Sequence, residues 1–185
     1  MQRDLVESAQ KGDHDAFEAL VAPCFDRLYS VAQRILRDRD RVDDAVQECL
    51  VRAWRDLRGL RDPDRFDAWL YRSLVNACRD EARRQRRHAP QLRAIPLTLA
   101  AQSGRPDAIV ERDELERGFR RLSIDQRSVL VMHHYLGLRS PEIAAILGVP
   151  VGTVHSRLHY ATEAMRAVLE ADARVPTVAV GGRTA

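Results

Sequence analysis

The segment from Arg139 to Leu169 constrains the fold more than any other, because its residues fit two helices joined by a tight turn. Ser140 is suited to cap the first helix, and Pro141 fits its first position, where the missing N–H costs nothing. Gly148 can adopt the positive φ that ends a helix abruptly. The sequence therefore predicts a helix-turn-helix.

The second helix of this motif has one apolar face, formed by Val154, Leu158, Ala161 and Met165 at helical spacing. Its other faces carry polar side chains, namely Thr153, His155, Ser156, Arg157, His159 and Tyr160. Such a helix, braced by a short first helix, suits the major groove of DNA. A helical hairpin within a hydrophobic core is the alternative. The turn residues and the small Ala144 at the crossing favour DNA binding.

Composition limits the classes of protein to consider. Charged residues make up 31% of the chain and hydrophobic residues 45%, which is ordinary for a soluble protein. The formal net charge of +3 is too small for a protein that coats DNA by charge alone. The sequence lacks an apolar run that could span a bilayer and an N-terminal signal peptide, so we expect a cytoplasmic protein without membrane insertion.

Candidate groups for catalysis or metal binding are sparse. Cys24, Cys49 and Cys78 match neither a disulfide framework nor a zinc pattern, so we expect reduced, buried thiols. His133 and His134 are adjacent and would point about 100° apart on a helix, which does not suit chelation. The sequence contains no nucleophile–base motif, P-loop or dinucleotide fingerprint. We therefore expect no catalytic residue, no metal and no cofactor.

Helical periodicity extends through most of the chain and alternating strand patterns are missing, which predicts an all-α fold. A first helical stretch, from about 13 to 36, should break at Pro23. A regular second helix covers about 42–57, and a third starts at Phe66 after a polar loop. Trp54 and Trp69 lie on the apolar stripes of these helices, which predicts core packing for both.

The chain divides into two small helical domains joined by a flexible linker. Prolines and a glycine interrupt any helix across 88–107, which separates a domain at 1–87 from one at 108–171. In the second domain, Ser123 and Gln126 form a capping box that starts the helix before the helix-turn-helix. We expect the tail, 172–185, to be disordered.

Three segments together resemble the sigma factors of the extracytoplasmic-function group, which are bacterial transcription factors. Asp43–Arg55, of sequence DDAVQECLVRAWR, and Phe66–Asp80, of sequence FDAWLYRSLVNACRD, resemble sigma region 2. The segment from Gln126 to Leu169 resembles region 4. The resemblance implies a stress-response protein that binds core RNA polymerase and directs promoter-specific initiation. It also implies a cognate anti-sigma factor that occludes the polymerase-binding surfaces.

The resemblance implies roles for particular residues. An acidic and amide-bearing helix face would meet a basic helix of the polymerase; it consists of Asp43, Asp44, Gln47 and Glu48. Amide, aromatic and guanidinium groups would hold the melted −10 strand; they belong to Arg58, Tyr71, Arg72, Asn76, Arg79, Arg83, Arg84, Arg86 and Arg87. The polar residues from Thr153 to Tyr160 would read the −35 duplex. For each acidic position, a solvated helix face remains the alternative.

Two other functions are compatible with part of the sequence. A LuxR-type helix-turn-helix regulator would share the C-terminal half, but it leaves Asp43–Arg87 unexplained. A sigma-like decoy that sequesters an anti-sigma factor would carry a phosphoacceptor domain, of which the sequence gives no sign. The arginines at 83–87 and the helix-turn-helix also argue against the decoy.

Overall fold

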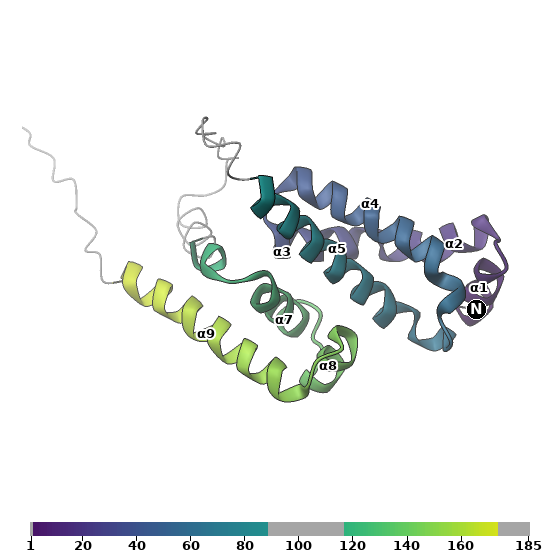
Figure 1. Ribbon diagram of the computed structural model, residues 1–185. Helices are drawn as coiled ribbons and strands as arrows, with labels where there is room; N and C mark the ends of the chain where they lie inside the picture. Colours follow the sequence, from purple (N-terminus) through teal and green to yellow (C-terminus); the bar gives the residue numbers. More distant parts are fainter. Residues whose placement is uncertain (1, 89–116, 174–185) are drawn as a thin grey trace, which may run out of the picture.

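The computed structural model describes residues 2–88 and 117–173, and every regular element in these ranges is helical. The all-α prediction is therefore confirmed. The predicted linker and tail, and the start of the second domain at 108, lie outside the described residues apart from their edges. Figure 1 shows a first helical group, α1 to α5, beside a second helical group, α7 to α9. Within these two ranges, no helix has the length and apolarity needed to span a membrane.

The first helical group begins with α1 (Gln2–Gln10), α2 (His14–Val21) and α3 (Phe25–Leu36). A 3-10 turn, η1 (Ala22–Cys24), separates α2 from α3 at Pro23, so the predicted break is confirmed. The sequence interpretation missed α1. Only Val6 and Ala9 of this helix are buried, which leaves a weak apolar pattern.

The most extensive packing in the first group is between α4 (Arg39–Asp56) and α5 (Phe66–His88), which lie along each other. Two short turns, η2 (Leu57–Gly59) and η3 (Pro63–Arg65), form the loop between them. Trp69 is half-buried, whereas the core prediction for Trp54 is wrong. Trp54 remains 36% exposed, and its ring covers His14 and Phe17 of α2.

The second helical group contains α7 (Ile124–His134), α8 (Ser140–Leu147) and α9 (Val151–Ala173). The capping box is confirmed: the Gln126 backbone N–H donates to Ser123 Oγ, and the Ser123 N–H donates to Gln126 Oε1. The cap prediction for Ser140 is wrong. Ser140 is already helical, and the N–H of Arg139 before it donates to Glu142 Oε2 at 2.8 Å.

The two helical groups dock through α7, which lies between α5 and α9 in Figure 1 and also contacts α3. Buried side chains of both groups belong to one hydrophobic cluster. Polar contacts add to it: Arg127 Nη1 donates to the carbonyl of Ile35, and the Arg34 guanidinium lies 3.8 Å from the centre of the Tyr135 ring. Docking therefore fixes the position of the helix-turn-helix relative to α5.

Gly148 ends α8 in the left-handed conformation at φ +64°, as the sequence predicted. We expect Gly148→Ala to lower the free energy of unfolding by about 1 kcal/mol, because a Cβ is strained in this conformation. The added Cβ would also lie 3.0 Å from Arg72 Nη2. Urea denaturation measures the change.

Gly152→Ala is the matched control for this substitution. Gly152 lies within α9, and a Cβ there would meet nothing within 4 Å. We expect it to stabilise the protein by roughly 0.5 kcal/mol, because alanine favours a helix. Equal changes in both variants would show that backbone conformation at Gly148 contributes nothing.

Candidate functional site

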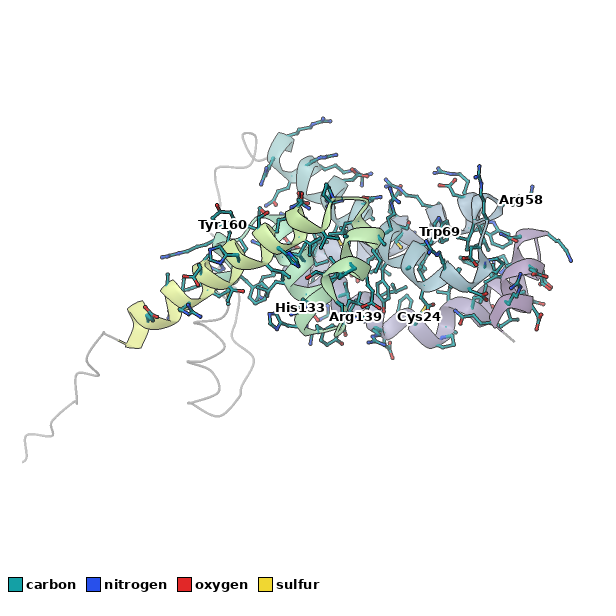
Figure 2. All side chains as sticks on the ribbon, turned by 90° about the horizontal axis from the view of Figure 1, so that it is seen from below. Cys24, Arg58, Trp69, His133, Arg139 and Tyr160 are labelled. Atoms are coloured by element: carbon teal, nitrogen blue, oxygen red, sulfur yellow. The ribbon has the colours of Figure 1, made fainter. Side chains whose placement is uncertain are left out.

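The first turns of α9 present most of the predicted DNA-reading side chains to solvent. His155, Ser156, His159 and Tyr160 are exposed, and Tyr160 reaches 63%. Thr153 is half-buried; its carbonyl accepts a hydrogen bond from Ser156 Oγ at 3.0 Å. The opposite face of α9 packs into the core through the buried side chains of Val154, Ala161 and Met165. Figure 2 shows the position of Tyr160 on α9. An amphipathic helix with this polar outer face remains available to a groove of DNA.

Arg157 differs from the other residues of this set, because its guanidinium turns toward α7. Arg157 Nη2 donates to Asp125 Oδ2 at 2.8 Å. The second oxygen of the same carboxylate, Oδ1, accepts from Arg79 Nε of α5 at 2.7 Å. Arg157 Nη1 is buried without a hydrogen-bond partner among the described residues. The structure therefore places Arg157 between the helical groups, away from the open face.

The predicted −10 residues of α5 lie on the side of this helix that faces the second group and solvent. Arg72, Asn76 and the arginines of the last turns are exposed, while Tyr71 and Arg79 are half-buried. Burial raises the pKa of the Tyr71 phenol, so this aromatic ring stays neutral. Arg79 Nη1 donates to Asn76 Oδ1 at 3.2 Å, which orients the amide.

An open cavity of about 690 Å³ lies between α5 and the second helical group. Its lining is rich in arginine: Arg52, Arg79, Arg83, Arg86 and Arg157 contribute, together with Asn76. Two carboxylates, of Asp80 and Asp125, also line the cavity and reduce its positive charge. The cavity therefore presents a positive potential that is partly neutralised from within the protein.

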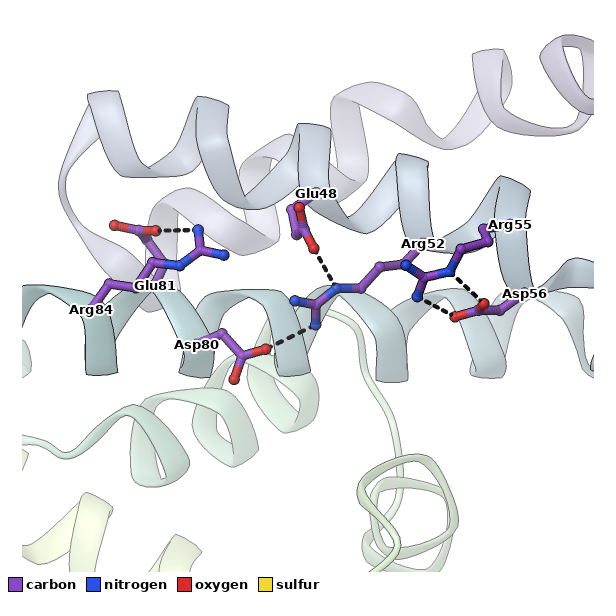
Figure 3. Close-up of polar contacts among 7 residues, drawn as sticks. All are labelled: Glu48, Arg52, Arg55, Asp56, Asp80, Glu81 and Arg84. Carbon is purple, nitrogen blue, oxygen red and sulfur yellow. Dashed lines mark hydrogen bonds and ion pairs between the residues drawn. The ribbon is translucent and has the colours of Figure 1, made fainter.

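The structure does not bring all predicted −10 residues together. Arg58 lies in η2, before α5, whereas the cluster formed by Arg83, Arg84, Arg86 and Arg87 lies at the other end of that helix. A helix of this length spans roughly 35 Å. Arg58 and the cluster could therefore meet only distant parts of one nucleic acid. Arg84 also pairs with Glu81 at 3.3 Å, as Figure 3 shows.

The predicted polymerase-binding residues on α4 divide into two sets. Asp43, Asp44 and Gln47 are exposed. Glu48 is half-buried and accepts from Arg52 Nε at 2.6 Å, and Arg52 Nη1 donates to Asp80 of α5 at 2.8 Å (Figure 3). Glu48 therefore belongs to a polar bridge between α4 and α5.

Sequence reasoning missed two exposed apolar residues on α4. Val51 is 54% and Trp54 is 36% exposed. They follow Asp44 and Gln47 at intervals of three and four residues, so these four side chains form one stripe along the helix. We call it the α4 stripe. The sequence did contain a signal for this surface. Val51 is apolar, yet its position does not fall on the helix face that Val42 and Cys49 define.

The cysteines show no sign of reactivity. All three are free, Cys49 and Cys78 are buried, and Cys24 is half-buried. Burial raises the pKa of Cys49 to about 11 and of Cys78 to about 12, so both thiols are protonated at neutral pH. Within 2–88 and 117–173, no three histidine, cysteine or acidic residues gather as a metal site would require.

Comparison with known proteins identifies the family. The family models for Sigma-70 region 2 and for Sigma-70, region 4 match residues 20–88 and 112–165. The ECF RNA polymerase sigma-E factor of Escherichia coli is 35% identical over 173 residues, which cover 87% of this chain and 90% of that protein. The chain belongs to the extracytoplasmic-function sigma factors. It therefore directs promoter-specific initiation by RNA polymerase.

Two solved structures show the same arrangement of helices. CnrH, in complex with the cytosolic domain of CnrY, is 32% identical with a TM-score of 0.68, covering 92% of this chain and 98% of that one. The sigma factor RpoE of Bartonella quintana, in complex with the anti-sigma factor NepR, matches at 22% identity with a TM-score of 0.68, covering 84% and 98%. The second likeness concerns the fold alone. The sigma factor family accounts for both helical groups, whereas a LuxR-type regulator would account only for the second.

Proposed function

We propose that this sigma factor uses three separate surfaces: the α4 stripe binds core polymerase, α5 holds the melted −10 strand, and the first turns of α9 read the −35 duplex. The observation that carries the proposal is the geometry of α8 and α9. A left-handed Gly148 ends α8, and α9 then buries its apolar face and exposes four polar side chains. The chain itself contributes recruitment and strand capture, with no catalytic group of its own.

For the −10 strand, Asn76 is the best-placed side chain on α5 for reading a base. It is exposed, its amide can donate and accept on a base edge, and Arg79 orients it. Tyr71 offers a neutral ring for stacking at a half-buried position. The arginines of the last turns of α5 suit the phosphates of the same strand.

For the polymerase, the α4 stripe combines a carboxylate, an amide and two apolar groups. A partner helix that carries basic and apolar residues would match it. Trp54 provides the large aromatic anchor that contributes most at many protein interfaces. Glu48 has a different role: through Arg52 and Asp80 it fixes α4 against α5, which positions the stripe.

An anti-sigma factor is a further expected partner. The structure of CnrH is that of a complex with the cytosolic domain of CnrY, and the structure of RpoE is that of a complex with the anti-sigma factor NepR. We propose that a regulator of this class covers the α4 stripe of the present chain. A decoy, in contrast, would bind such a regulator but never core polymerase.

The decisive test is transcription in vitro, with purified core polymerase, this protein and a library of random promoter regions. We expect discrete transcripts that depend on the protein, preceded by two sequence elements. Failure to form any complex with core polymerase would refute the proposal and favour the decoy. A complex that gives transcripts without an upstream element would refute the role assigned to α9.

Charge reversal tests the α4 stripe. We expect Asp44→Lys to weaken binding to core polymerase about tenfold, because a like charge would then face the basic partner helix. Fluorescence anisotropy with labelled protein measures this affinity. Glu163→Lys is the matched control, since Glu163 is exposed on α9 and pairs only locally, with Arg166. Equal loss in both variants would assign the effect to net charge.

Replacement of an exposed α9 residue tests the reading of the −35 duplex. We expect His155→Ala to lower transcription from the selected promoters about tenfold through loss of a base-edge contact, and to leave polymerase binding unchanged. His134→Ala is the control, because His134 is exposed at the end of α7, outside the helix-turn-helix. Unchanged transcription in the His155 variant would remove this residue from the interface.

A further inference from the structure

One carboxylate holds an arginine from each of the two helices, α5 and α9, to which DNA binding is assigned above. Asp125 lies in the first turn of α7, where it accepts from Arg79 Nε of α5 at 2.7 Å and from Arg157 Nη2 of α9 at 2.8 Å. The two arginines are largely covered and Asp125 is partly exposed, with 19%, 23% and 37% of the side-chain surface exposed for Arg79, Arg157 and Asp125. Charge-assisted pairs of this geometry are among the stronger hydrogen bonds.

Other contacts across the same junction act in the same direction as Asp125, including the hydrophobic cluster that both helical groups share. Arg127 Nη1 donates to the carbonyl of Ile35 at 3.0 Å, and Arg34 covers the Tyr135 ring. The turn of the helix-turn-helix lies beside α5, where a Cβ on Gly148 would be 3.0 Å from Arg72 Nη2. Three arginines predicted to bind DNA therefore lie at the docked junction. Arg79 and Arg157 donate to Asp125, and Arg72 lies beside Gly148.

The docked arrangement conflicts with simultaneous use of both surfaces. Arg79 and Arg157 lie within about 8 Å of each other, since each nitrogen is in contact with an oxygen of the same carboxylate. By their numbering, positions −10 and −35 are about 25 base pairs apart, which at about 3.4 Å per base pair is roughly 85 Å along a duplex. The two helical groups must therefore separate before Arg79 and Arg157 can contact the two elements together.

We propose that Asp125 is a latch that holds the free sigma factor closed by taking the place of a DNA phosphate. Carboxylate and phosphate are alternative partners for a guanidinium group, so Asp125 and DNA compete for Arg79 and Arg157. Opening exposes both arginines at once. This inference rests on the surfaces assigned under the proposed function.

The strength of the latch suits a reversible device. Its two ion pairs are partly exposed, and pairs of that kind contribute little individually. Binding of the α4 stripe to polymerase leaves the latch accessible, because the stripe lies on the exposed side of α4. A partner that binds the open form better than the closed form can therefore release it.

The test uses the full chain without polymerase and measures shape and DNA binding separately. In Asp125→Asn, we expect the radius of gyration from small-angle X-ray scattering to increase by several ångströms. We also expect affinity for a fluorescent duplex of random sequence at low salt to rise about threefold to fivefold, as loss of a partly exposed ion pair would allow. Neither measurement needs the promoter sequence, so failure here is distinct from failure in transcription.

Two further variants make the result specific. Arg34→Gln removes the contact with Tyr135 while leaving Asp125 and the proposed DNA-binding residues in place, and we expect it to open the protein as well. Glu163→Gln removes one negative charge, as Asp125→Asn does, from a local pair on α9, and we expect no change in shape or affinity.

The possible results separate clearly. An increased radius and tighter duplex binding in the Asp125 and Arg34 variants, with an unchanged Glu163 variant, support the latch. An unchanged radius for Asp125→Asn overturns it. An increased radius without tighter binding overturns the competition with phosphate. Tighter binding in the Glu163 variant to the same degree would assign the effect to net charge and also overturn the proposal.

Discussion

The packing of α7 against α3 and α5 is the contact that decides whether Arg79 and Arg157 are accessible. Arg127 is its centre: its guanidinium donates to carbonyls of Phe119 and Ile35, and burial lowers its pKa. The same packing turns Arg79 and Arg157 inward toward Asp125. Residues that do not meet α7, such as His155, stay open. The relative position of two small helical groups thus decides which cations DNA can reach.

This arrangement favours an order of binding events. The docked form already presents the α4 stripe, with Val51 and Trp54 exposed, whereas Arg79 and Arg157 of the two proposed DNA-binding surfaces share the Asp125 carboxylate. Under the proposed assignments, polymerase binds before promoter DNA. Once both helical groups are fixed at separate places on the polymerase, weak contacts with two DNA elements combine through a high effective concentration. The latch proposal thus assigns promoter recognition to the complex and not to the free chain.

Several local signals in the sequence were sufficient to predict the structure, although the residue that caps α8 was misplaced by one position. The break at Pro23, the capping box at Ser123 and the left-handed Gly148 depend on a few neighbouring residues, and all three were predicted. Sequence failed where a distant residue decided the outcome. Trp54 remains partly exposed because it packs on α2, and Arg157 turns inward because Asp125 accepts from it. Periodicity assigns a residue to a helix face but does not identify the partner across the junction.

Internal carboxylates also explain how an arginine-rich surface is compatible with a selective DNA-binding protein. Arg52 pairs with Glu48 and Asp80, and Asp125 neutralises charge on two further arginines. Nonspecific affinity depends on the number of phosphates that free cations can neutralise. If the latch opens in the polymerase complex as proposed, pairing these cations within the chain lowers binding to nonpromoter DNA more than it lowers binding in that complex. Selectivity increases because the competing sites are numerous, even though each internal ion pair is weak.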